Sequence, residues 1–169
     1  MAELRNQDQL HSSLLDRLVD DEPDKKTEPK DKRGISQAKL RESVLRDLNW
    51  LFNASNLSAV QDLESYPEVA NSVLNYGMPD FTGHTISGVD VPEIERLLRQ
   101  VICDFEPRIL HRTIRIRLIV DEQQMNHNAM SFDIEGELWA HPVPLHVYLK
   151  TELDLDVGEI KVSDYSGAA

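Results

Sequence analysis

The tetrapeptide Phe105-Glu106-Pro107-Arg108 places a carboxylic acid and a guanidinium on either side of a proline. Apolar residues at helical spacing precede it, and an alternating pattern typical of a strand follows it. Pro107 lacks the N–H that a helix needs and biases Glu106 away from helical geometry, so the helix must end here. Glu106 could act as a general acid, and both charges could make ionic contacts.

Two structural roles are open for Glu106, Pro107 and Arg108. The charged side chains could form salt bridges with a partner protein, or they could brace the joint between helix and strand. Since the two charges stand two residues apart across a rigid proline, we expect a close mutual ion pair to be geometrically unfavourable. A buried charge left without a partner costs several kcal/mol, so substitution should be severe in either role.

The other reactive side chains predict no site. Six histidines are scattered without the spacing of a metal site, and the single Cys103 has no second cysteine to pair with. Gly83 and Gly88 are not followed by the Gly-Lys-Ser/Thr of a phosphate loop. Cys103 lies within a predicted amphipathic helix, where a buried thiol is the favoured interpretation. We therefore expect no catalytic residue, no metal and no cofactor.

Polar side chains are most regular in the C-terminal third. Arg115 and Arg117 share one face of a predicted strand, and a polar turn at residues 121–128 leads into the next. This hairpin should place Arg117 opposite Asp133 and Arg115 opposite Glu135, with roughly 0.2–1 kcal/mol from each pair. The charge ladder is either a solvated outer face or the frame of a sheet whose free edge accepts a strand from another protein.

An α+β framework must position these residues. Helical spacing predicts a helix that follows Ser36 as N-cap and ends near Asn53, at the start of a domain that begins near Ile35. Two further helices are predicted from Tyr66-Pro67 to Gly77 and from a capping-box-like Asp90-Val-Pro-Glu93 to Phe105. Alternation predicts strands beginning near Thr113, Met130 and Leu145, and a short one at residues 159–162. We predict N-terminal helices packed on a small antiparallel sheet formed by the C-terminal third, with Trp50 in the core.

The N-terminal region has two parts. Leucines at helical spacing form an apolar stripe in residues 1–20, on a segment too short to be stable alone. Residues 21–34 contain no aliphatic or aromatic side chain, which predicts a charged flexible linker. The helix either folds back on the domain at residues 35–163 or docks in a groove of another subunit. Its predicted docking residues are Leu14, Leu15, Arg17 and Leu18, and residues 164–169 are expected to be a tail.

The overall composition limits the classes of partner that the protein can bind. Asp and Glu number 30 against 18 Lys and Arg, for a net charge of −12. Such a charge disfavours nucleic acid and anionic lipid; it suits a basic protein partner, or it serves only to keep the chain soluble. No apolar run approaches the roughly 20 residues of a membrane span, and the first residues have no apolar stretch typical of a signal peptide. We expect a cytoplasmic protein without direct membrane insertion.

Several segments, in the right order, resemble the TssE family of baseplate wedge subunits of the bacterial type VI secretion system. They are Ser13-Leu-Leu-Asp-Arg-Leu18, Tyr66-Pro-Glu-Val69, Leu74-Asn-Tyr-Gly77, Glu106-Pro107-Arg108 and Phe132-Asp-Ile-Glu-Gly-Glu-Leu-Trp139. The family is similar to a wedge protein of contractile-tail bacteriophages and is often labelled lysozyme-like. The resemblance runs from about Ser13 to Val162, interrupted by the charged linker.

The resemblance implies a structural role. A TssE-like subunit joins other wedge proteins of the TssF, TssG and TssK type, in a baseplate complex recruited to the inner membrane. Through its small sheet it templates polymerisation of a TssB/TssC-type contractile sheath by strand addition. The resemblance further implies a sheath contact for Glu106, Pro107 and Arg108, and N-terminal docking for Ser13 to Leu18.

The lysozyme-like label raises an alternative, a peptidoglycan-cleaving glycosidase that uses Glu106. Such an enzyme needs two carboxylates, roughly 5 Å apart if retaining or about 6.5–9.5 Å apart if inverting. No second carboxylate stands out: Asp104 is close in the chain, and the other acids lie on predicted strand faces or in the linker. The neighbouring Arg108 favours the ionised carboxylate, the wrong form for a general acid. The residues therefore favour assembly over catalysis.

Overall fold

The computed structural model describes residues 13–18, 24, 35–79, 81, 90–119, 129–140 and 143–165. Its helices are α1 (Leu14–Leu18), α2 (Gln37–Asn53), α3 (Pro67–Ala70) and α4 (Val91–Phe105), with 3₁₀ turns η2 (Leu57–Ala59) and η3 (Val73–Asn75). Its strands are β1 (Arg115–Ile119), β2 (Ala129–Leu138), β3 (Leu145–Asp154) and β4 (Ile160–Asp164). The α+β prediction is confirmed, and the predicted turn at 121–128 lies outside the described residues.

The four strands form one antiparallel sheet in the order β1-β2-β3-β4. The predicted register of the first hairpin is confirmed, since Arg115 lies opposite Glu135 and Arg117 opposite Asp133. In the part of the chain that the structure describes, no ion pair joins these four side chains. The ladder is thus an alignment of opposite charges on the outer face and not a set of closed salt bridges.

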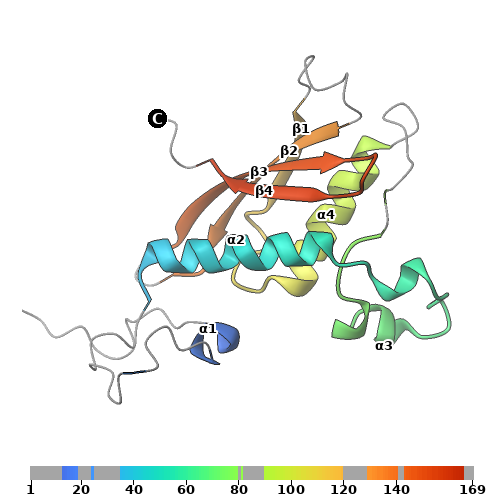
Figure 1. Cartoon of the computed structure of the whole chain (residues 1–169), viewed down its shortest axis with the longest axis horizontal. Helices are drawn as coiled ribbons and strands as arrows, with labels where there is room; N and C mark the ends of the chain where they lie inside the picture. Colours follow the sequence, from blue (N-terminus) through green and yellow to red (C-terminus); the bar gives the residue numbers. More distant parts are fainter. Residues whose placement is uncertain are drawn as a thin grey trace, which may run out of the picture.

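Helices and sheet enclose one hydrophobic core (Figure 1). Alternate residues of the strands point inward, as their two-residue period requires, and meet the apolar stripes of α2 and α4. Residues with almost no exposed surface include Leu48, Ile102, Phe132, Ile134 and Val147. The opposite face of the sheet carries the polar residues, and among the described residues helices cover one side of the sheet.

Helix α2 begins as predicted, because the Ser36 hydroxyl accepts a hydrogen bond from the Lys39 N–H at 3.2 Å. The prediction for Trp50 is wrong, however: 54% of this residue is exposed. Trp50 stands two residues after the buried Leu48, which turns it about 200° around the helix and away from the core. Its ring lies instead under the Arg46 guanidinium, 5.1 Å from the ring centre.

The connection between α2 and α4 differs from its prediction. The helix that opens at Pro67 ends after one turn at Ala70, and a separate 3₁₀ turn precedes Gly77. Gly77 is not a helix cap; its positive φ of 121° lets the chain pass so close to Ala54 that a Cβ would lie 2.2 Å from the Ala54 carbonyl oxygen. The predicted capping box is also wrong, because Asp90 precedes α4 without a capping hydrogen bond from its side chain.

Candidate functional site: the joint between helix and sheet

Helix α4 ends in a turn that folds Glu106 and Arg108 onto the same side. Glu106 is the C-cap, with φ −121° and ψ 77°, and its N–H still donates to the Ile102 carbonyl at 2.9 Å. The Ile109 N–H then donates to the Glu106 carbonyl at 3.2 Å, which closes a turn over Pro107 and Arg108. Proline suits such a turn because its φ is already fixed near the required value.

This turn brings the two charges together, so the expectation that they would not pair is wrong. The Arg108 Nε donates to Glu106 Oε1 at 2.7 Å, and Nη2 donates to Oε2 at 2.5 Å. The Arg108 backbone N–H also donates to Oε1 at 3.1 Å. Only 3% of Glu106 is exposed, so its carboxylate is a buried group whose partner is a bidentate guanidinium.

Arg108 reaches from this turn to helix α2. Its Nη2 donates to Asp47 Oδ2 at 2.6 Å, and Nη1 donates to the Ser43 hydroxyl at 3.3 Å. Burial alone disfavours the charged guanidinium, but the hydrogen bonds and negative charges of Glu106, and then of Asp47, raise the pKa of Arg108. One permanently charged side chain therefore joins the end of α4 to the middle of α2.

The same turn is attached to the sheet through its backbone. The Trp139 N–H donates to the Arg108 carbonyl at 2.7 Å, and the Leu110 N–H donates to the Glu137 carbonyl at 2.8 Å. Between them Ile109 forms an isolated bridge with Leu138, at the end of β2. The joint, defined here as Ser43, Asp47, Glu106, Pro107 and Arg108, thus connects two helices and the sheet.

This geometry does not suit glycoside hydrolysis. The carboxylate nearest to Glu106 across the joint is that of Asp47, and both carboxylates bind the same guanidinium. Arg108 occupies the space between them, where a sugar would have to lie. The arrangement holds elements together, and the Glu106 and Asp47 carboxylates face Arg108 instead of an open site.

A charge network continues from the joint to the N-terminal helix. Asp47 accepts from Arg46 at 2.8 Å, and Arg46 donates to Asp16 of α1 at 2.7 Å. Burial opposes the charged form of Asp16, but hydrogen bonds from Ser13 and Arg46 and the Arg46 charge lower its pKa overall. Helix α1 is therefore attached to α2 through its polar side.

The apolar side of α1 remains exposed. Leu14 is 72% exposed, Leu15 42% and Leu18 74%, and Arg17 also faces solvent. The helix thus contacts its own domain through Asp16, none of its residues is buried, and docking on another subunit stays a prediction.

Both outer edges of the sheet are occupied by helix side chains. On β4, the Asn49 carboxamide exchanges two hydrogen bonds with the Val162 backbone, at 3.0 and 3.2 Å. The Asn53 carboxamide does the same with Ile160, at 2.9 and 2.7 Å. Two asparagines four residues apart on the helix thus pair with two residues that are two apart on the strand. Helix α2 therefore makes the edge hydrogen bonds that a fifth strand would otherwise make.

The β1 edge is covered differently. Glu95 of α4 accepts from the Leu118 N–H at 2.9 Å, while Arg99 reaches the Ile114 and His111 carbonyls at 3.5 and 3.4 Å. The Arg99 contacts are longer than those at β4, and both Glu95 and Arg99 are flexible charged side chains. Sequence patterns did not reveal Asp47, Asn49 or Glu95; the one available signal was a pair of asparagines, poor helix formers, at helical spacing.

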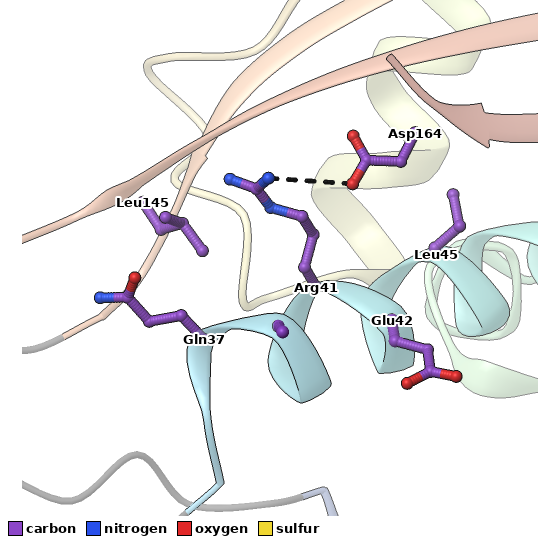
Figure 2. A pocket seen from close by; sticks show the side chains of 7 residues that line it. Gln37, Arg41, Glu42, Leu45, Leu145 and Asp164 are labelled. Carbon is purple, nitrogen blue, oxygen red and sulfur yellow. Dashed lines mark ion pairs between the residues drawn. The ribbon is translucent and has the colours of Figure 1, made fainter. Parts of the chain in front are cut away.

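Figure 2 shows a cavity of about 420 Å³ between the first turns of α2, the start of β3 and the end of β4. Arg41 crosses it, with Nη1 3.9 Å from Asp164 and Nη2 donating to the His146 carbonyl at 2.8 Å. None of the joint residues lines it. Within the described ranges there is no metal-binding cluster of His, Cys, Asp or Glu, and no helix is long and apolar enough to span a membrane.

Comparison with known families gives one decisive result. The profile of the family described as baseplate wedge protein gp25 matches residues 38–143, more than half of the chain. The chain belongs to this family. Neither the curated proteins nor the solved structures contain a significant match. The family is one of structural baseplate proteins, which agrees with the expected non-enzymatic role.

The matched region contains every residue of the joint, from Ser43 to Arg108, as well as Trp139 at the end of β2. It excludes α1, and it ends before β3 begins at Leu145. The ionic joint therefore lies within the gp25 region, whereas the Asn49 and Asn53 seam links that region to a strand beyond it.

Proposed function

We propose that this chain is a structural wedge subunit of a type VI secretion baseplate. In this role it joins TssF-, TssG- and TssK-type wedge proteins and templates a TssB/TssC-type contractile sheath through its sheet. Membership of the gp25 family and the TssE-like segments support the proposal. The complex is cytoplasmic and recruited to the inner membrane by its partners, and the acidic surface of this subunit binds neither nucleic acid nor lipid directly.

The observation that carries the proposal is the connection of three elements through Arg108. A template must present its strands in a fixed orientation. The Arg108 guanidinium links α2 and the end of α4 through charge-assisted hydrogen bonds, and its backbone carbonyl accepts from Trp139 at the end of β2. Glu106, Pro107 and Arg108 then support the sheath contact mainly by bracing the sheet, because Glu106 is buried.

Strand addition is best accommodated at the β1 edge. Two neutral carboxamides close the β4 edge with four hydrogen bonds, two donated and two accepted. At β1, a partner strand has to displace Glu95 and Arg99, which regain hydration when they leave. Backbone hydrogen bonds would then supply affinity, and the charge ladder on the adjoining face would favour one register.

Helix α1 supplies a second contact in this proposal. Its exposed leucines suit a groove of another wedge subunit, and the partly buried pair of Asp16 with Arg46 is the contact that has to break if the helix reorients. Helix-in-groove binding would bury Leu14, Leu15 and Leu18 together.

A reconstitution experiment tests the proposed function. The purified full chain is mixed with TssF- and TssG-type subunits and with sheath proteins, and complexes are separated by size. Wild type should bind both sets; a variant without residues 1–34 should stay folded, bind the wedge subunits more weakly, and still bind sheath. Release of reducing ends from peptidoglycan, lost in Glu106→Gln, would instead establish the glycosidase alternative.

A further inference from the structure

The segment 57–77, called here the 57–77 excursion, exposes several large apolar side chains within a short stretch of chain. Val60 is 84% exposed, Tyr66 58%, Val73 79% and Leu74 67%. Single exposed apolar residues are ordinary, but several within one short segment are typical of an interaction surface. Figure 1 shows the excursion standing out beyond the C-terminal end of α2, apart from the sheet.

The excursion is a closed and ordered loop. At its base the Met78 N–H donates to Ala54 at 2.7 Å and the Asn56 N–H donates back to Met78 at 3.0 Å, around the close passage of Gly77. Within it, the Asn75 side chain accepts from the Ser58 N–H and donates to Ala70, both at 2.9 Å. Since these bonds fix the loop in advance, its apolar groups can bind a partner at little ordering cost.

The base of the excursion is also fixed against the joint. The Tyr76 ring meets Phe105 edge to face, with centroids 5.3 Å apart. Burial, followed by the negative charges of Asp47 and Glu106, raises the pKa of the Tyr76 hydroxyl. A protein bound to the excursion would therefore be held at a defined position relative to Glu106 and the sheet.

The charge of the excursion identifies the chemistry of its occupant. Asp62, Glu64 and Glu68 are exposed, and residues 54–79 include no Lys or Arg. A second copy would bring the same acidic loop and a net charge of −12. Anionic lipid would be repelled in the same way. A segment that combines apolar anchors with basic residues satisfies both features of this surface.

We propose that the 57–77 excursion docks a basic, amphipathic segment of another wedge subunit. Tyr66, Val73 and Leu74 supply the apolar contacts, and Glu64 and Glu68 pair with Lys or Arg of the partner. This surface is separate from the α1 leucines and from the β1 edge. That the partner is a wedge subunit rests on the proposed function; the chemistry of the segment rests on the excursion alone.

The test measures binding of the full chain to purified TssF- and TssG-type subunits. Val73→Ser/Leu74→Ser and Glu64→Lys/Glu68→Lys should each raise Kd at least about 10-fold, and higher salt should weaken wild-type binding. The matched control is Val157→Ser, since Val157 is 69% exposed after β3 and should not affect Kd. Circular dichroism and Tm of each variant confirm that the fold is retained.

A photo-crosslinker at Val60 identifies the occupant in the same complex, and one at Val157 serves as its control. The expected product joins Val60 to a partner peptide with more Lys and Arg than Asp and Glu. Unchanged Kd in both double variants, a crosslink to a second copy, or Leu74-dependent binding to phosphatidylglycerol vesicles would overturn the inference. If the wild-type chain binds no wedge subunit, the proposed function fails as well. If the wild-type chain binds and both double variants bind with the same Kd, this inference fails alone.

Discussion

Helix α2 is attached to the rest of the molecule in two chemically different ways. Toward β4 it uses Asn49 and Asn53, whose neutral carboxamides pair with the strand backbone. Toward the α4 turn it uses Asp47, which binds Arg108 together with the buried Glu106. The neutral seam should respond little to salt or pH, whereas the ionic joint depends on charge balance. One helix is thus attached by a neutral contact on one side and by an ionic contact on the other.

The two contacts also differ in the free energy that is lost when one of their members is removed. A hydrogen bond contributes roughly 0.5–1.5 kcal/mol, because its groups are solvated in the unfolded chain. Removal of one member of a buried ionic cluster costs about 3–5 kcal/mol, since the remaining charges stay buried without a partner. The joint should therefore be the more sensitive contact, although the seam has more bonds to the sheet.

The largest expected effect is that of Arg108→Met. This change leaves the buried Glu106 carboxylate without a cation, while Asp47 keeps its contact with Arg46, and it should lower the free energy of unfolding by about 3–5 kcal/mol. Urea denaturation of the isolated protein measures it. Unchanged stability combined with lost sheath assembly would show that Arg108 serves a partner contact and not the fold.

A charge exchange sharpens this result. Glu106→Arg/Arg108→Glu keeps the mutual pair but turns the contact with Asp47 into a repulsion, so stability should not return. Adding Asp47→Lys should recover part of the loss, because position 108 then faces a cation. Full recovery by the double variant alone would mean that Asp47 contributes nothing to the joint.

The next effect is that of Asn49→Leu/Asn53→Leu in the neutral seam. It removes the four hydrogen bonds of the seam and leaves the edge-facing backbone groups of Ile160 and Val162 unpaired, for an expected loss of about 2–4 kcal/mol. The loss should be the same at 50 mM and 500 mM NaCl, about a tenfold range in ionic strength. A salt-dependent loss would contradict the distinction between seam and joint.

Local sequence patterns predicted the elements and the first hairpin, but they did not predict the contacts between distant elements. The strand register around Arg117 and Asp133 could be inferred because alternation and a short turn determine it. The contact of Asp47 with Arg108 spans 61 positions in the chain, and no local pattern encodes it. The Glu106–Arg108 pair was mispredicted for a different reason, since its geometry depends on the φ and ψ of one C-cap residue.

A smaller effect is expected at the β1 edge from Glu95→Ala. Loss of the bond to the Leu118 N–H should cost about 1 kcal/mol and leave the strand edge more accessible. Arg96→Ala, an exposed neighbour on the same helix, is the control. Analytical ultracentrifugation should show more self-association, or sheath proteins should bind more tightly, in Glu95→Ala alone. If neither changes, Glu95 does not protect the edge.

The smallest effect concerns the attachment of α1 through Asp16. Because the folded pKa of Asp16 lies below its ordinary value of 3.8, the attachment is present above that value. It is lost as the pH falls through the lower, folded pKa. Helix α1 has five residues and none of them is buried, so Tm should scarcely change while the amides of residues 13–18 become more mobile in NMR relaxation. Asp16→Asn should show this mobility at every pH, and an α1 that stays rigid in this variant would mean that contacts other than the Arg46 pair hold it.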